Sequence, residues 1–321
     1  MSDVAALART SEVALLAADA SPALAPLLAD AILRQRQLDA LLELALARAS
    51  AALATAGLDT RVALLKGGVT ARTVYPTTAH RFRRDLDLLV PDGPDVDIVN
   101  IRAALLAVGF ADDAGPDRAA LGPRAVRAWP MVLRPFGATG LVLSIDLHRR
   151  LVEVPWCRPD LAAMFADARK DGAPLPLTSP RDTLVHTAIH LAENGFRLPL
   201  KAWVDVVRLV PTVAPDALAE RALQHGARAA TYAAVHVASR WFALDAAEHL
   251  APLAPPAPQR WALHAALGGD GIHPHRLGLG PARRFFRALV ADDARGAVVS
   301  VGSALRVPGG WRSIARFARD G

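Results

Sequence analysis

The stretch that decides the fold is Arg84-Asp85-Leu86-Asp87-Leu88-Leu89-Val90, in which two carboxylates precede an apolar run. Side chains two positions apart on a β-strand point to the same face, so Asp85 and Asp87 should project together from a buried strand. Neighbouring carboxylates repel each other, and a cation offsets that repulsion. A ligand set made of oxygen suits Mg²⁺, which also takes substrate phosphates. The other interpretation is a strand that begins near a solvated turn, because acidic residues are mostly exposed.

A glycine pair lies upstream, in Leu64-Leu65-Lys66-Gly67-Gly68-Val69-Thr70. We predict a short buried strand over 62–65, a turn at the glycines, and a helix from Val69 to Tyr75. Glycines let a backbone approach a phosphate, and a helix N-terminus offers N–H donors. Lys66 would add a charge and Thr70 a hydroxyl, so both join Gly67 and Gly68 as candidate nucleotide-binding residues. A tight turn without a ligand is the other interpretation, and the Walker A pattern is missing.

A third carboxylate follows in Leu143-Ser144-Ile145-Asp146-Leu147-His148, where apolar and polar residues alternate. Two apolar runs, 131–135 and 141–147, predict a hairpin, and Asp146 and His148 should share one face of its second strand. Beside the strand of Asp85, Asp146 would complete a three-carboxylate cluster. His148 is a candidate substrate contact, or it lies at the edge of the sheet.

The order of these motifs resembles the nucleotidyltransferase superfamily that includes DNA polymerase beta: a glycine pair opening a helix, an Asp-x-Asp strand, and a third Asp on a later strand. A closer likeness is to a bacterial group described as uncharacterised nucleotidyltransferases. The matching stretches are Leu65-Lys66-Gly67, an arginine at 81 or 84, Asp85 to Val90, and Asp146-Leu147-His148. The likeness spans roughly residues 60–210. One departure is Gly68, which stands where the superfamily usually has a small polar residue.

The resemblance implies transfer of a nucleoside monophosphate from a nucleoside triphosphate to an acceptor, with release of pyrophosphate. Asp85, Asp87 and Asp146 would be the catalytic residues and would hold two Mg²⁺ ions, with Mn²⁺ as the other candidate. Arg84 would join the residues that bind the nucleotide. The acceptor stays open between a small molecule, a peptide, a protein and an RNA. The alternative is a non-catalytic nucleotide-binding protein with a regulatory or antitoxin-like role.

Two histidines, His186 and His190, are four residues apart and so lie on one face of a predicted helix. They are candidate substrate contacts, matched to a His-containing helix of the resembling group. With a third ligand they could bind zinc. Packing between helices is the other interpretation.

The expected fold class is α+β: a small mixed β-sheet nucleotidyltransferase core flanked by N-terminal and C-terminal helical regions. We divide the chain into an N-terminal helical region (1–58), the core (59–178) and a C-terminal helical region (179–321). The apolar periodicity of 3–56 and 180–250 supports the two helical regions.

The composition narrows the class of protein. The net charge is +6 and the sequence pI is about 10.3. Almost all of the basic residues are arginines, and GC-rich coding alone would also enrich a sequence in arginine. The basic run 283–287 reads as an amphipathic helix segment rather than a nucleic-acid surface. The single cysteine excludes an internal disulfide and fits a cytoplasmic location. Residues 1–50 read as amphipathic helices rather than a signal peptide, and no uncharged apolar stretch would span a membrane, so we expect no membrane partner.

Overall fold

The computed structural model describes residues 2–10, 12–90, 98–123, 128–134, 142–151, 156–196, 199–267, 288–293 and 297. The chain packs as two compact units. The first consists of Met1–Leu151 and Leu161–Thr183, and the second of Val152–Asp160 and Leu184–Gly321. The basic run 283–287 and the expected loop at 277–281 lie outside the described residues. Within the described part, no helix combines the length and the apolarity needed to cross a membrane.

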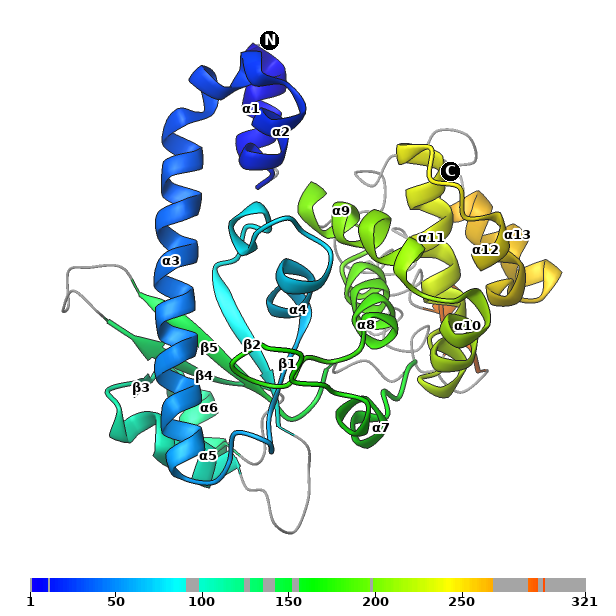
Figure 1. Ribbon diagram of the computed structural model, residues 1–321. Coiled ribbons are helices and arrows are strands. Elements are labelled where there is room, and N and C mark those ends of the chain that lie inside the picture. The colour runs from blue at the N-terminus through cyan, green and yellow to red at the C-terminus, as the bar shows by residue number, and fades with distance from the viewer. Residues whose placement is uncertain are drawn as a thin grey trace. The chain divides into compact units, whose positions relative to one another are not determined.

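The first unit begins with the expected helices, α1 (Ser2–Thr10), α2 (Ala14–Ala20), the 3₁₀ turn η1 (Pro22–Leu24) and the long α3 (Ala25–Thr55). The predicted break at Ser21-Pro22 is confirmed, and Pro22 starts the turn that leads into α3. A second break, which the sequence did not reveal to us, lies between α1 and α2. There Glu12 has a φ of 60°, a left-handed conformation that ends the first helix. Figure 1 shows α3 running along the whole unit.

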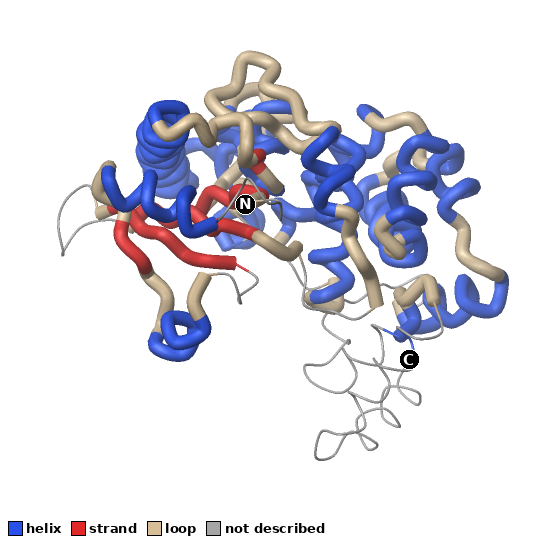
Figure 2. Tube along the Cα trace, turned by 90° about the horizontal axis from the view of Figure 1, so that it is seen from below, coloured by secondary structure: helices blue, strands red, loops and turns tan. Residues whose placement is uncertain are grey.

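A five-stranded mixed sheet forms the centre of the first unit, with the strand order β1-β2-β5-β4-β3. Its strands are β1 (Ala63–Leu64), β2 (Asp85–Leu89), β3 (Ala111–Asp112), β4 (Ala128–Leu133) and β5 (Leu143–His148). β2 and β5 run parallel, whereas the other three pairs are antiparallel. The expected small mixed sheet is therefore confirmed, and Figure 2 shows its strands gathered together.

Helices cover one face of this sheet and form the core with it. The connecting elements are α4 (Lys66–Thr73), the 3₁₀ turn η2 (Thr78–His80), α5 (Ile98–Ala107), α6 (Pro116–Leu121) and α7 (Leu161–Ala166). The core contains Leu86, Leu88, Ile145 and Leu147 from the sheet, Leu42 and Leu46 from α3, and Ile101 and Leu105 from α5. The apolar members of β2 and β5 thus point towards α3 and α5, and the alternate positions point to the other face.

The helix and strand bounds differ in part from the sequence prediction. α4 begins at Lys66 rather than at Val69, so Gly67 and Gly68 lie in its first turn and not in a preceding loop. β4 runs from Ala128 to Leu133, so it begins three residues before the predicted apolar run 131–135 and includes Pro130. β3 has only two residues, which is too short for a hydrophobic pattern to reveal it.

The second unit is helical, as expected. Its elements are α8 (Pro180–Glu193), which starts in the first unit, α9 (Leu200–Leu209), the 3₁₀ turn η3 (Val210–Thr212), α10 (Pro215–Gln224), α11 (Arg228–Phe242), α12 (Ala247–Leu253) and α13 (Ala257–Ala266). Pro255 and Pro256 lie between α12 and α13, and Pro256 is the N-cap of α13, whereas Pro252 lies inside α12 and does not end that helix. Prolines are tolerated at a helix start because the first N–H groups have no partner within the helix.

Two polar contacts involve α11. The rings of His236 and His264, on α11 and α13, stack with their centroids 4.3 Å apart. Burial lowers the pKa of His236 to about 4, helped by the charges of His264 and Arg240. At the other end of α11, Asp292 accepts hydrogen bonds from the backbone N–H groups of Arg228 (2.5 Å) and Ala229 (2.8 Å). This carboxylate caps the helix although it is distant in the sequence.

Candidate active site

The parallel pairing of β2 with β5 places the acidic residues side by side. Asp87 is the register partner of Asp146, and Asp85 is the partner of Ser144. Directly paired residues of parallel strands point to the same face, so Asp87 and Asp146 lie next to each other on the face opposite to the core. The prediction that the two strands are neighbours, with their carboxylates on one face, is confirmed.

Asp87 is the centre of a short polar network. Its Oδ1 atom accepts a hydrogen bond from Lys66 Nζ at 2.7 Å and lies 2.6 Å from His148 Nε2. Lys66 Nζ and His148 Nε2 are 3.5 Å apart. Asp87 and His148 are both buried, whereas the Lys66 side chain keeps 24% of its exposure. Because β5 is the middle strand of the sheet, His148 does not lie on an edge strand, and its ring contacts a candidate metal ligand instead.

Asp146 completes a group that fits a divalent cation. Ligand atoms of Asp87, Asp146 and His148 all lie within 4.8 Å of one another, and this is the one such group among the described residues. Two carboxylates and one imidazole are a donor set that suits Mg²⁺ or Mn²⁺ through oxygen, and Mn²⁺ also through nitrogen. Ser144 Oγ, at 3.4 Å from Asp146 Oδ1, adds a weak polar contact.

The two carboxylates have opposite electrostatic environments. Burial alone would raise the pKa of Asp87, but the Lys66 ammonium and the His148 ring outweigh burial and hold that pKa well below its usual range. The pKa of Asp146 is raised, first by burial and then by the negative charge of Asp87. The pair therefore carries an electrostatic repulsion that a bound cation would relieve.

Asp85 is less closely involved than its neighbours. It is the exposed first residue of β2, on the same face as Asp87, and it is not a member of the group of three. Its expected role as a metal ligand stays a prediction.

The start of α4 explains part of the Leu-Lys-Gly stretch. Lys66 has a φ of 47°, which is left-handed and strained for a residue with a side chain. A Cβ atom on Gly68 would come within 3.1 Å of the Leu64 side chain, so a larger residue there would need Leu64 to shift by a few tenths of an ångström. A Cβ atom on Gly67 would meet Arg83 Cγ at 3.4 Å and the Arg81 guanidinium at 3.7 Å. Packing therefore accounts for Gly68, whereas Gly67 lies beside two arginines.

From the sequence, Arg81 was only the alternative to Arg84 as the family's arginine, and Arg83 was not predicted to take part. Arg81 and Arg83 are both buried, and Arg83 forms ion pairs with Asp39 and, at 2.7 Å, with Glu43 of α3. Arginine is common in this sequence, so a single arginine carried little signal. The contacts with α3, at residues 40 and 44 positions away in the sequence, distinguish Arg83 from its neighbours.

Two other candidates lie in unexpected surroundings. Thr70 is fully buried, and its hydroxyl has no hydrogen-bond partner among the described residues, so it does not offer the exposed hydroxyl of the Gly-Ser pattern. Arg84 forms an ion pair with Glu12, in the turn between α1 and α2, and its guanidinium lies over the ring of Phe82 at 5.7 Å. Their roles in binding nucleotide stay predictions.

The histidine pair belongs to the second unit. His186 is buried on α8, and His190, one turn later, lies 3.4 Å from Asn194 Nδ2 through its Nδ1 atom. Neither histidine is in a metal-binding group within the part of the chain that the structure describes. The zinc interpretation therefore has no third ligand there, and contact with a substrate stays a prediction.

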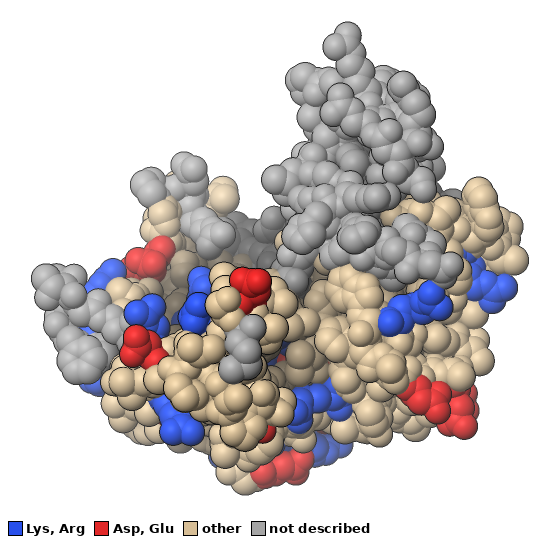
Figure 3. Space-filling model, turned by 90° about the horizontal axis from the view of Figure 1, so that it is seen from above, with Lys and Arg blue, Asp and Glu red and all other residues tan. Residues whose placement is uncertain are grey.

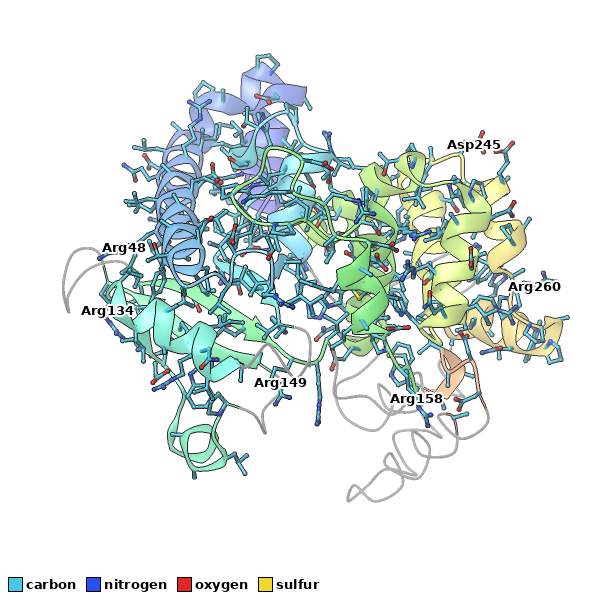
Figure 4. The ribbon with its side chains drawn as sticks, turned by 60° about the horizontal axis from the view of Figure 1, so that its bottom comes forward. Arg48, Arg134, Arg149, Arg158, Asp245 and Arg260 are labelled. Carbon is cyan, nitrogen blue, oxygen red and sulfur yellow. The ribbon has the colours of Figure 1, made fainter. Side chains whose placement is uncertain are left out.

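A groove elsewhere on the first unit is lined by neither carboxylates nor histidines. It has a volume of about 380 Å³ and lies between α3 and α5, with Arg48 as its charged residue; Figure 4 labels that arginine. Alanines supply most of its lining. Because α3 and α5 cover the apolar face of the sheet, the groove is not part of the Asp87 cluster.

Surface charge adds little to this picture. On the face drawn in Figure 3, the described lysine and arginine side chains are interspersed with aspartate and glutamate side chains.

Comparison with known proteins supports the motif assignment. Residues 3–243 match the family model described as "Uncharacterised nucleotidyltransferase". No curated protein matches the chain. Among solved structures, the chain matches MenT4, described as a nucleotidyltransferase toxin from Mycobacterium tuberculosis, with 16% identity and a TM-score of 0.37, over 91% of this chain and 98% of that one. At that similarity the match carries no argument about activity.

Proposed function

The chain belongs to the uncharacterised nucleotidyltransferase family, and from this membership we propose that it transfers a nucleoside monophosphate from a nucleoside triphosphate to an acceptor, with divalent metal ions at Asp87 and Asp146. The observation that carries the proposal is the register of β2 and β5, which pairs these two carboxylates on the polar face of the sheet. His148 and Lys66 contact the same site.

The metal site fits the known chemistry of such transfers. Bound divalent ions would stabilise the attacking and leaving oxygens of an in-line displacement at the α-phosphate. Asp87 is the buried, ionised ligand that would hold the metal firmly. Asp146 is half-buried, so it is the carboxylate that an acceptor hydroxyl could reach and to which it could give its proton. Asp85 would extend the ligand set from the exposed end of β2.

The triphosphate would lie at the start of α4. There the backbone N–H of Gly67 would face the anion and the helix dipole favours negative charge, whereas the N–H of Gly68 donates to the Leu65 carbonyl at 3.1 Å. Lys66 and the guanidinium of Arg81 lie next to that turn. Arg84 and Thr70 would play smaller parts, because one pairs with Glu12 and the other is buried.

The acceptor remains one of the four classes: small molecule, peptide, protein or RNA. The alternative function is a nucleotide-binding protein without catalysis, in a regulatory or antitoxin-like role. The pairing of Asp87 with Asp146 at one site favours catalysis, because metal-assisted displacement needs carboxylates that hold the ions there.

The test is transfer of label from α-³²P nucleoside triphosphates, with Mg²⁺ or Mn²⁺, to a cell extract separated into small molecules, RNA and protein. Asp87→Asn keeps the size of the side chain and removes its charge, so it should lower transfer by roughly a thousandfold or more. Asp59→Asn, a change of the same kind at the Lys170 ion pair, is the matched control and should leave transfer intact. Nucleotide binding by the wild-type protein without transfer to any fraction would favour the non-catalytic alternative.

A further inference from the structure

The Lys66 ammonium lies where a metal ion would compete with it. Its Nζ atom is 2.7 Å from Asp87 Oδ1 and 3.5 Å from His148 Nε2, and both of those atoms belong to the candidate ligand group. Asp87 Oδ1 therefore already has a cation beside it in the metal-free protein. A divalent ion bound to that oxygen would face an ammonium at close range, and like charges at such a distance repel strongly.

We propose that Lys66 is an internal counter-cation of Asp87, that a divalent metal ion displaces it, and that the displaced ammonium then binds the phosphates of the nucleotide. This inference rests on the proposed function, because it assumes the metal site at Asp87 and Asp146. It goes further by making one lysine the link between metal binding and nucleotide binding.

The local geometry permits the exchange. Lysine has a flexible four-carbon stem and a compact charge, and this side chain is 24% exposed, so the ammonium can turn towards solvent without leaving the site. Lys66 is also the first residue of α4, so the ammonium stays close to the helix N-terminus at which phosphates would bind.

The backbone at Lys66 supports a built contact rather than a chance one. A φ of 47° is costly for a residue with a Cβ atom, and such strain persists only where the surroundings impose it. Here it occurs at the junction of β1 with α4, at the residue whose side chain contacts Asp87. A methionine at this position would keep the stem length and the same backbone strain, and would lack the charge.

The exchange predicts a measurable coupling. In the wild-type protein, a metal ion must first displace the ammonium, so metal binding is weakened while nucleotide is absent. Once displaced, the ammonium favours the triphosphate, so each ligand should strengthen the binding of the other by the same factor. Without the lysine, the metal ion should bind more tightly alone, and the part of the coupling that Lys66 supplies should be lost.

The experiment measures Mn²⁺ affinity by electron paramagnetic resonance, with and without a non-hydrolysable nucleoside triphosphate analogue. Lys66→Met is compared with Lys170→Met, which removes an equal charge from an ion pair with Asp59 elsewhere in the same unit. We expect Lys66→Met to bind Mn²⁺ about tenfold more tightly than the wild type without nucleotide. Lys170→Met should match the wild type. The strengthening of Mn²⁺ binding by the analogue should be smaller in Lys66→Met than in either other protein.

Equal Mn²⁺ affinities for the wild type and Lys66→Met would overturn the inference and leave the metal site standing. If neither protein bound Mn²⁺, with or without the analogue, the metal-dependent function would be lost as well. The wild type offers a second readout that does not depend on the variant folding, because the chain has only three lysines. With ¹³C-labelled lysine, Mg²⁺ should shift one lysine side-chain signal in nuclear magnetic resonance. Unchanged signals for all three lysines, at Mg²⁺ concentrations that saturate the site, would also refute the displacement.

Discussion

Asp87→Asn and Asp146→Asn should change the stability of the metal-free protein in opposite directions, although both should abolish transfer. Asp87 is buried, and the Lys66 ammonium and the His148 ring hold its pKa low, so the folded protein is stabilised by its ionised form. Asp146 has a raised pKa because of burial and the charge of Asp87, so its ionised form opposes folding. Neutralising the first removes an attraction, and neutralising the second removes a repulsion.

The size of each change in the free energy of unfolding depends on which charge stays without a partner after the substitution. Removing one partner of a fully buried ion pair costs about 3–5 kcal/mol, because the other charge is left uncompensated. Lys66 is 24% exposed and can turn to solvent, so we expect a smaller loss for Asp87→Asn, about 1–3 kcal/mol. Asp146→Asn should leave the free energy of unfolding unchanged or raise it.

The assay is urea unfolding in the presence of a chelator, followed by circular dichroism, for the wild type and the two variants. The m-value should stay constant, so that a shift in midpoint reports stability. Equal destabilisation by the two substitutions, or a more stable Asp87→Asn protein, would refute this electrostatic reasoning. From the repulsion between carboxylates alone, Asp87→Asn would be expected to stabilise the metal-free protein; the ion pair of Asp87 with Lys66 is the reason that we predict a loss of stability instead.

Further substitutions and a pH profile test the packing around this site and in the second unit. Gly68→Ala should lower the free energy of unfolding by about 1–3 kcal/mol, because its Cβ would lie 3.1 Å from the Leu64 side chain. Gly67→Ala should lower it less. Thermal melts of the two variants measure this order, and the reverse order would contradict the packing argument. Asp292→Ala should cost about 1 kcal/mol through loss of the cap on α11, and an unchanged melting temperature would show that the cap contributes nothing. Stability should fall as the pH drops from about 6.5 to about 4, because the unfolded chain protonates His236 before the folded protein does. His236→Asn should flatten that part of the pH profile, and an equally steep profile in the variant would contradict the assignment.

Local patterns were enough to predict the strands that carry the carboxylates. Alternation along residues 143–148 and the apolar run after Asp87 gave both strands and the facing of their side chains, because strand periodicity depends on neighbours two positions apart. The same reasoning placed the helical regions on either side. The order of Asp87 and Asp146 in the chain matched the resemblance, and the sheet register then paired them directly.

Contacts between distant parts of the chain could not be predicted in this way. Arg83 meets Asp39 and Glu43 of α3 only after the chain has folded, and no periodicity marks it among many arginines. α4 begins at Lys66, whose backbone is left-handed. The sequence did not predict this start, because lysine rarely adopts that conformation. The role of His148 beside Asp87 depends on a hydrogen bond between strands that are 61 positions apart in sequence.

The most direct test of the metal-dependent mechanism is anomalous diffraction from a crystal of the protein grown with Mn²⁺ and a non-hydrolysable nucleoside triphosphate analogue. We predict an anomalous peak at about 2.0–2.3 Å from carboxylate oxygens of Asp87 and Asp146, a distance typical of small divalent cations, with the triphosphate beside the first turn of α4. Bound analogue without a peak between these two carboxylates, or with Mn²⁺ only at another position, would contradict the account.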